Sequence, residues 1–132
     1  AFYDDDIRKG FLHSHSYTGN PLACSAALGM LSIFEATDVF LENKNKAIKI
    51  NLLLENYKNL PIKDLRNIGM IWAFELDPSI DISKVTAYCI SNGLLLRPIR
   101  NTIYFMPPYS ISDREIKHMI SVTENGIKEA CL

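Results

Sequence analysis

Long apolar runs, a strong charge bias and closely spaced cysteines are all missing from this sequence. No apolar stretch approaches the roughly 18 residues of a membrane-spanning helix, so we expect no membrane partner. Fourteen basic residues balance fifteen acidic ones, and they form no basic stripe, which argues against a nucleic-acid partner. The three cysteines, Cys24, Cys89 and Cys131, are too widely spaced for a disulfide framework. Because the first residues also lack the pattern of a secretory signal, we expect a reducing, cytoplasmic location with all three cysteines buried.

Several signatures of specific chemistry are missing as well. The chain has no glycine-rich nucleotide loop and no G-x-S-x-G nucleophile elbow. His13 and His15 are spaced as two metal ligands could be, but no third ligand accompanies them and His118 is far along the chain, so we expect no metal site. What remains is the composition of an ordinary folded domain, with 48% apolar and 22% charged residues.

The most informative stretch is HSHSYTGNPLAC, from His13 to Cys24. Asn20 and Pro21 are typical of the N-cap and the first position of a helix, and they predict a helix that continues to about Ala36. The hydroxyl groups and amides before this helix could hold a phosphate or a carboxylate near the positive end of its dipole. From these residues alone, an ordinary Ser/Thr-rich loop is the simpler interpretation.

The rest of the chain alternates between helical and extended patterns. These patterns predict an α/β fold in which helices pack on a small, largely antiparallel sheet. The expected segments are an amphipathic helix from Asp38 to near Leu60, one or two mostly buried strands within Lys63 to Leu76 bent at Gly69, a short helix from Asp81 or Ser83 to Asn92, two strands at Leu94 to Pro98 and Thr102 to Met106 joined by a turn at Arg100 and Asn101, and a last helix that starts at the capping box of Ser112 and Glu115.

Apolar residues at helical spacing predict which side of each helix is buried. The expected inward positions are Ala23, Ala27, Met30 and Phe34 in the first helix, Phe40, Ala47, Ile50, Leu54 and Tyr57 in the second, Val85, Tyr88 and Cys89 in the third, and Ile116, Ile120, Thr123 and Ile127 in the last.

Arg97 is the candidate for recognising a carboxylate. It follows the apolar residues Leu94 to Leu96 and precedes Pro98, so we expect its planar guanidinium at the rigid end of a strand, where it could clamp a carboxylate. Tyr104, on the partner strand, could add a hydroxyl to the same site. A solvated or locally paired arginine and a half-buried tyrosine would explain the same residues.

Two motifs together resemble a known family. HSHSYTGNPLAC resembles the H-G-x-T-Y-x-G-N-P-L-A segment of the class III, fold-type I aminotransferases, which use pyridoxal phosphate. RPIRNTIYFMPPY, from Arg97 to Tyr109, resembles the R-P-x-G-x-x-I-Y-x-M-P-P-Y segment of a subgroup, the adenosylmethionine-8-amino-7-oxononanoate aminotransferases of biotin synthesis, and Arg66 to Leu76 is similar too. The resemblance implies a carboxy-terminal third of such an enzyme. Residues 1–36 would then end the large cofactor-binding domain, and residues 37–132 would form the small domain.

The resemblance also implies roles for individual residues. Ser16 stands where the family has a threonine that holds the cofactor phosphate of the other subunit, and His15 would contribute backbone. Ser14, at a position that is usually glycine, would lie against the substrate, and Arg97 would bind the substrate carboxylate. The implied assembly is a homodimer with a composite active site.

Three departures from the family pattern bear on these roles. Ser16 keeps the hydroxyl but lacks the methyl group that fixes its rotamer. Ser14 adds a side chain beside the substrate. Arg100 replaces a turn glycine, so we expect the bend to keep φ below zero there or to use Asn101 for the left-handed position.

The lysine that forms the Schiff base in this family has no counterpart here. Lys9 is too close to the His13 to Cys24 stretch and has the wrong context. The resemblance implies transfer of an amino group from S-adenosylmethionine to 8-amino-7-oxononanoate, but this chain alone contributes no catalytic residue and should be inactive. Two alternatives stay open: another class III aminotransferase that acts on ω-amino acids, and a non-enzymatic α/β interaction module.

Overall fold

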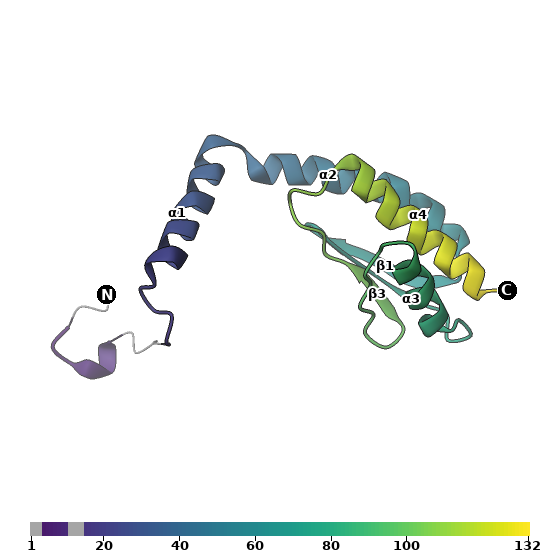
Figure 1. Ribbon diagram of the computed structural model, residues 1–132, viewed down its shortest axis with the longest axis horizontal. Helices are drawn as coiled ribbons and strands as arrows, with labels where there is room; N and C mark the ends of the chain where they lie inside the picture. The colour runs from purple at the N-terminus through teal and green to yellow at the C-terminus, as the bar shows by residue number, and fades with distance from the viewer. Residues whose placement is uncertain (1–3, 11–14) are drawn as a thin grey trace. The chain divides into compact units, whose positions relative to one another are not determined.

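The computed structural model describes residues 4–10 and 15–132 (Figure 1). The contacts within the chain divide it into two units, of which the first ends at Val39 and the second is Phe40–Leu132. In chain order the elements are the short 3-10 helix η1 (Ile7–Lys9), α1 (Pro21–Ala36), α2 (Val39–Leu54), the 3-10 helix η2 (Glu55–Asn59), β1 (Ile62–Ile68), β2 (Ile71–Leu76), α3 (Ile82–Ser91), β3 (Thr102–Phe105) and α4 (Asp113–Ala130). Among the described residues, no single helix is long and apolar enough to cross a membrane, and α1 with the helix that follows meets that criterion only as a bent pair.

The two strongest predicted helix starts are confirmed. The Asn20 side-chain oxygen accepts the amides of Leu22 and Ala23, at 3.0 and 3.1 Å, at the start of α1. At the start of α4, the Ser112 hydroxyl accepts the Glu115 amide at 3.3 Å, and the Glu115 carboxylate accepts the Ser112 amide at 2.8 Å. The hydrogen bonds from Ser112, the hydroxyl first, lower the pKa of the Glu115 carboxyl group. These local polar contacts satisfy amides that a helix leaves without partners at its first turn.

The two middle helices are also confirmed. Helix α2 ends at Leu54, and η2 continues the helical stretch to Asn59, close to the end that the sequence predicts. Asp81 is the N-cap of α3, because its carboxylate accepts the Ser83 amide at 2.9 Å. Asp81 therefore takes the role for which Ser83 was the alternative.

The sheet has three antiparallel strands in the order β1-β2-β3. Ile68 pairs with Ile71 across the turn between β1 and β2, and Trp72 pairs with Phe105 between β2 and β3. The register of β1 shifts between Lys63 and Arg66. The predicted small antiparallel sheet is confirmed.

The predicted strand at Leu94 to Pro98 is wrong. This segment is irregular, and only Ile99 and Thr102 form an isolated bridge next to it. Pro98 has no amide to donate to a ladder, and the chain turns back at once, because the Thr102 amide donates to the Ile99 carbonyl at 3.0 Å. Arg100 takes a φ of 54° in this turn, so the expectation that Arg100 would avoid the left-handed region is also wrong.

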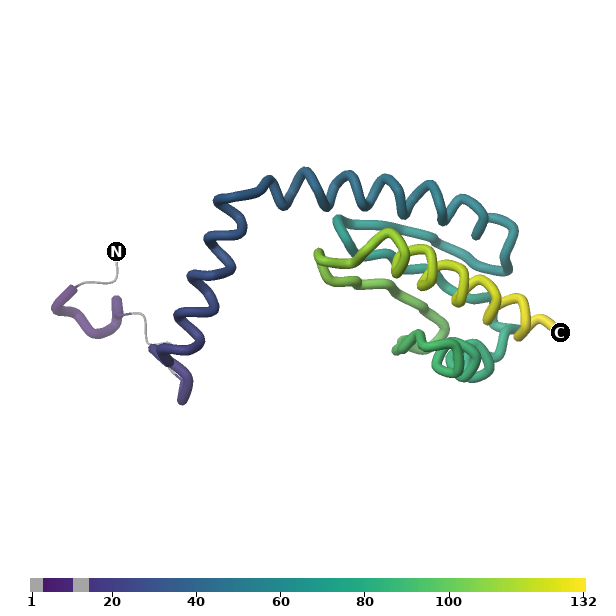
Figure 2. The backbone as a smooth tube through the Cα atoms, turned by 45° about the horizontal axis from the view of Figure 1, so that its top comes forward, coloured from purple at the N-terminus to yellow at the C-terminus, as the bar shows by residue number. Residues whose placement is uncertain are grey.

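The core lies on one face of the sheet. Helices α2 and α4 lie side by side over this face, and α3 packs beside α4 (Figures 1 and 2). The Tyr57 ring meets the Phe74 ring edge to face at 5.4 Å, and its hydroxyl donates to the Ile120 carbonyl at 2.8 Å. Burial raises the pKa of the Tyr57 hydroxyl. The side chains in this core that are almost fully buried include Ile50, Leu54, Trp72, Phe74, Leu76, Val85, Cys89, Ile103, Ile116, Thr123 and Ile127.

Several positions that the sequence places inside are exposed. No residue of α1 is buried, and Phe40 at the start of α2 is exposed. Most of β1 is exposed as well, because only its first residue is even half-buried. Cys24 and Cys131 are exposed, and only Cys89 is buried as expected. The apolar character of most of these residues favours burial, but within the described chain they stay exposed.

Candidate functional site

The loop before α1 closes into a compact turn. The Thr18 hydroxyl accepts the His15 amide at 3.0 Å, and the Thr18 amide donates to the His15 carbonyl at 2.9 Å. The Tyr17 amide donates to His15 Nδ1 at 3.2 Å. The turn ends at Gly19, whose φ of 73° lies in the left-handed region that glycine adopts without strain.

Ser16 is the candidate residue of this turn for binding an anion. Within residues 4–10 and 15–132, neither its amide nor its hydroxyl has a hydrogen-bond partner, and the residue is exposed. Asn20 occupies the amides of Leu22 and Ala23, so an anion cannot use those two donors of α1. The Ser16 hydroxyl and amide are two adjacent donors, which suits the oxygen-rich phosphate group of pyridoxal phosphate.

The other residues of this loop that the sequence suggests as ligand-binding provide less structural evidence. Ser14, the expected substrate neighbour, and His13 lie outside the described residues. His15 takes part in the turn through its backbone and its ring. In the part of the chain that the structure describes, no group of three or more His, Cys, Asp or Glu side chains could hold a metal ion.

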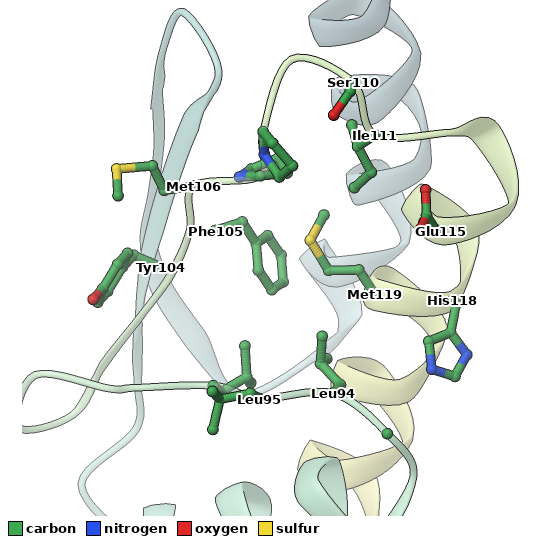
Figure 3. A pocket seen from close by; sticks show the side chains of 14 residues that line it. Leu94, Leu95, Tyr104, Phe105, Met106, Ser110, Ile111, Glu115, His118 and Met119 are labelled. Carbon is green, nitrogen blue, oxygen red and sulfur yellow. The ribbon is translucent and has the colours of Figure 1, made fainter. Parts of the chain in front are cut away.

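Arg97 and Tyr104 line one hollow of about 170 Å³ in the second unit. Tyr104 lies on β3 between the buried residues Ile103 and Phe105, so its side chain points to the face of the sheet that the helices leave open. Figure 3 shows Tyr104 on the opposite side of β3 from Phe105. Arg97 is exposed and belongs to the irregular segment before Pro98, not to the end of a strand.

In the described part of the chain, no acidic side chain pairs with Arg97. Among residues 4–10 and 15–132, no carboxylate lies within ion-pair distance of its guanidinium. Arg66, by contrast, is paired with Asp64. Arg97 is therefore able to bind a carboxylate from outside the chain, and the Tyr104 hydroxyl shares its hollow.

A larger groove of about 420 Å³ adjoins this hollow and is lined mostly by apolar side chains (Figure 3). It runs between the segment after α3, the end of β3 and the first turns of α4. Ile111, just before α4, and Met119, in α4, contribute to it. Leu95 and Met106 line both spaces. Neither residue was predicted as part of the site from the sequence, although Leu95 lies two residues before Arg97 and Met106 two residues after Tyr104.

The turn before β3 provides a stability test. We expect Arg100→Gly to raise the free energy of unfolding by about 0.5–1 kcal/mol, because a left-handed conformation disfavours a residue with a side chain more than the added freedom of glycine destabilises the fold. Urea denaturation followed by circular dichroism measures the change. Arg100→Ala keeps the strained backbone and should give little gain, so equal stabilisation by both variants would contradict the argument.

The family model for class III aminotransferases matches residues 4–127. The chain belongs to the class III aminotransferase family. Among its curated relatives, the adenosylmethionine-8-amino-7-oxononanoate aminotransferase of Helicobacter pylori is 44% identical over 126 residues, which cover 86% of this chain and 28% of the relative. The enzyme of the same name from Methanocaldococcus jannaschii is 35% identical over 137 residues, which cover 94% of this chain and 30% of the relative.

Solved structures of aminotransferases share the fold of this chain. The crystal structure of the Methanocaldococcus jannaschii adenosylmethionine-8-amino-7-oxononanoate aminotransferase matches with a TM-score of 0.83 and 33% identity, over 94% of this chain and 31% of that one. The ornithine aminotransferase of Toxoplasma gondii, a structure with partial occupancy of PLP at its active site, matches with a TM-score of 0.78 and 27% identity, over 95% of this chain and 31% of that one. The predicted fold class, part of a fold-type I aminotransferase, is confirmed. The chain spans less than a third of the length of each of these relatives.

Proposed function

We propose that this class III aminotransferase chain is part of an enzyme that transfers an amino group from S-adenosylmethionine to 8-amino-7-oxononanoate, giving 7,8-diaminononanoate in biotin biosynthesis. The observation that carries the proposal is an arginine, Arg97, that has no acidic partner within the described chain and shares a hollow with Tyr104. The names of the two relatives described above support it.

In this proposal, Arg97 and Tyr104 hold and orient the substrate. The guanidinium of Arg97 binds the carboxylate of the oxononanoate with two parallel hydrogen bonds, and the Tyr104 hydroxyl donates a further one. Binding the acid end of the substrate fixes the position of its distant keto group, which lowers the entropy cost of reaction there.

Pyridoxal phosphate is the proposed cofactor, and it supplies an electron sink for the bond changes at the reacting carbon. The Ser16 hydroxyl and amide, with the backbone of His15, would hold its phosphate, and Ser14 would lie against the substrate. By the family resemblance, this phosphate belongs to the cofactor of the neighbouring subunit. The proposed enzyme is therefore a cytoplasmic homodimer whose active site contains residues of both copies.

A second candidate is another class III aminotransferase that acts on an ω-amino acid. The fold similarity to the ornithine aminotransferase favours it. Substrate profiling of the enzyme that contains this chain separates the two candidates, because only the first predicts a preference for 8-amino-7-oxononanoate over ω-amino acids and their aldehydes.

The test of the proposal is Arg97→Ala in that enzyme. We expect the KM for 8-amino-7-oxononanoate to rise about tenfold or more, since a hydrogen bond to a charged group contributes roughly 1.5–3 kcal/mol. Steady-state kinetics with varied oxononanoate measures the change. Arg114→Ala removes an exposed arginine of α4 outside the hollow and should leave the KM unaltered. An unchanged KM in Arg97→Ala would refute the assignment.

A further inference from the structure

We propose that Leu95 and Met106 make the Arg97 site selective for carboxylates attached to an unsubstituted alkyl chain. The two side chains would form apolar walls along the methylene groups next to the bound carboxylate. This inference rests on the proposed role of Arg97 in binding the substrate carboxylate, and it adds two residues that would determine which carboxylates the site accepts.

The backbone around Arg97 places Leu95 on the ligand side. Leu96 is 7% exposed and packs in the core, whereas Leu95 on one side of it is 73% exposed. Leu95 and Arg97, which flank Leu96 in the chain, are both exposed. Both line the same hollow.

Strand β3 places Met106 in the same way. Ile103 and Phe105 are buried under the helices, and Tyr104 and Met106 point to the opposite side (Figure 3). Met106 is 66% exposed and lines the hollow with Tyr104. Two neighbouring segments therefore both contribute polar and apolar side chains to a single concave surface.

The charges of this surface define the ligand. Arg97 is the only charged side chain that lines the hollow in the described chain, and the remaining lining is Leu95, Leu96, Tyr104 and Met106. One carboxylate can therefore be neutralised. A second charged group on the carbons next to the carboxylate would be desolvated by contact with Leu95 and Met106. It would gain no oppositely charged partner in return, which is unfavourable. The arrangement suits an aliphatic monocarboxylate and disfavours α-amino acids and short dicarboxylates.

The exposure of these apolar side chains also supports a ligand role. Large apolar side chains that gather on one open surface and are bordered by a polar group often mark a ligand-binding site. The adjoining groove of about 420 Å³ is lined mostly by apolar side chains, although Ser110, Glu115 and His118 also line it, so a chain of several methylene groups has an apolar surface to follow.

The test uses the 132-residue chain with methyl-labelled leucine and methionine. Butanoate, hexanoate and octanoate are titrated against it, followed by nuclear magnetic resonance, alongside the alcohols of equal length. A fully buried methylene group strengthens binding about fourfold; because the hollow is open, we expect each added methylene to lower the Kd of the acids about twofold, with the methyl signals of Leu95 and Met106 shifting most. The acids should bind more tightly than the alcohols.

Variants separate the two parts of the site. In the double variant Leu95→Ser and Met106→Ser, the Kd should no longer depend on chain length, while Ile90→Ser, an exposed residue of α3 outside the hollow, should keep the dependence. A chain-length dependence that survives in the double variant overturns the inference, and so does a Kd that is equal for all three acids in the unaltered chain. Arg97→Gln should abolish the preference for acids over alcohols. If Arg97→Gln keeps this preference, the proposed carboxylate-binding role of Arg97 is wrong. The dependence of Kd on chain length tests the roles of Leu95 and Met106 separately.

Discussion

The 132-residue chain by itself is expected to form no diaminononanoate from S-adenosylmethionine and 8-amino-7-oxononanoate, even with pyridoxal phosphate added. The resemblance to the class III family implies a lysine that moves the proton at the reacting carbon, and no lysine of this chain stands in a matching motif. A positioned proton-transferring side chain contributes about 10²–10⁴-fold to the rate. Mass spectrometry of the product measures the turnover.

Turnover should appear when the region of a relative that this chain does not match is supplied. Coexpression with the remainder of the Helicobacter pylori relative, which this chain matches over 28% of its length, is expected to raise the rate at least about 10²-fold over the chain alone. The matched control replaces Ser16 by alanine in the coexpressed pair, and it should need more pyridoxal phosphate for half-maximal rate. Turnover by the chain alone would contradict the lysine argument. A lack of turnover in the complemented pair as well would favour the non-enzymatic interaction module.

Replacement of Trp72 by alanine is expected to lower the free energy of unfolding by about 3–5 kcal/mol, as large buried aromatic side chains do when they are truncated. Trp72 lies on β2 under the helices and is almost completely buried. Its Nε1 donates to the Asn51 side-chain oxygen of α2 at 2.6 Å, so the variant removes both packing and a polar link between sheet and helix.

Urea denaturation followed by far-ultraviolet circular dichroism measures this loss. Ile68→Ala is the matched control, because Ile68 belongs to the same hairpin but is 79% exposed, and it should change the free energy of unfolding by no more than about 0.5 kcal/mol. Equal losses in the two variants would show that the core does not depend on Trp72.

Local signals in the sequence predict the helix starts well. The Asn20 cap and the box of Ser112 and Glu115 act within three residues of themselves, so no knowledge of distant contacts is needed. Burial is harder to predict, because it depends on which residues distant in the sequence pack against a side chain. The spacing of Met30 and Phe40 is helical, yet both are exposed.

In the candidate site, too, some features could be predicted from the sequence and others could not. The sequence suggests that Arg97 and Tyr104 meet, and the structure places them on one hollow. It does not predict that Leu94 to Pro98 stays outside the ladder, because hydrogen bonding between strands depends on the whole sheet. The positive φ of Arg100 was also unexpected, since this position normally favours glycine. The binding roles of Ser14, His15, Ser16, Arg97 and Tyr104 stay predictions.

The irregular register of β1 has a consequence for self-association. Strand β1 is an edge of the sheet, and between Lys63 and Arg66 its pairing shifts while Asp64 takes a φ of 51° and pairs with Arg66. An interrupted, charged edge cannot offer a long row of free donors and acceptors. Growth of this sheet into fibrils by addition of strands from other molecules is therefore obstructed at its outer border.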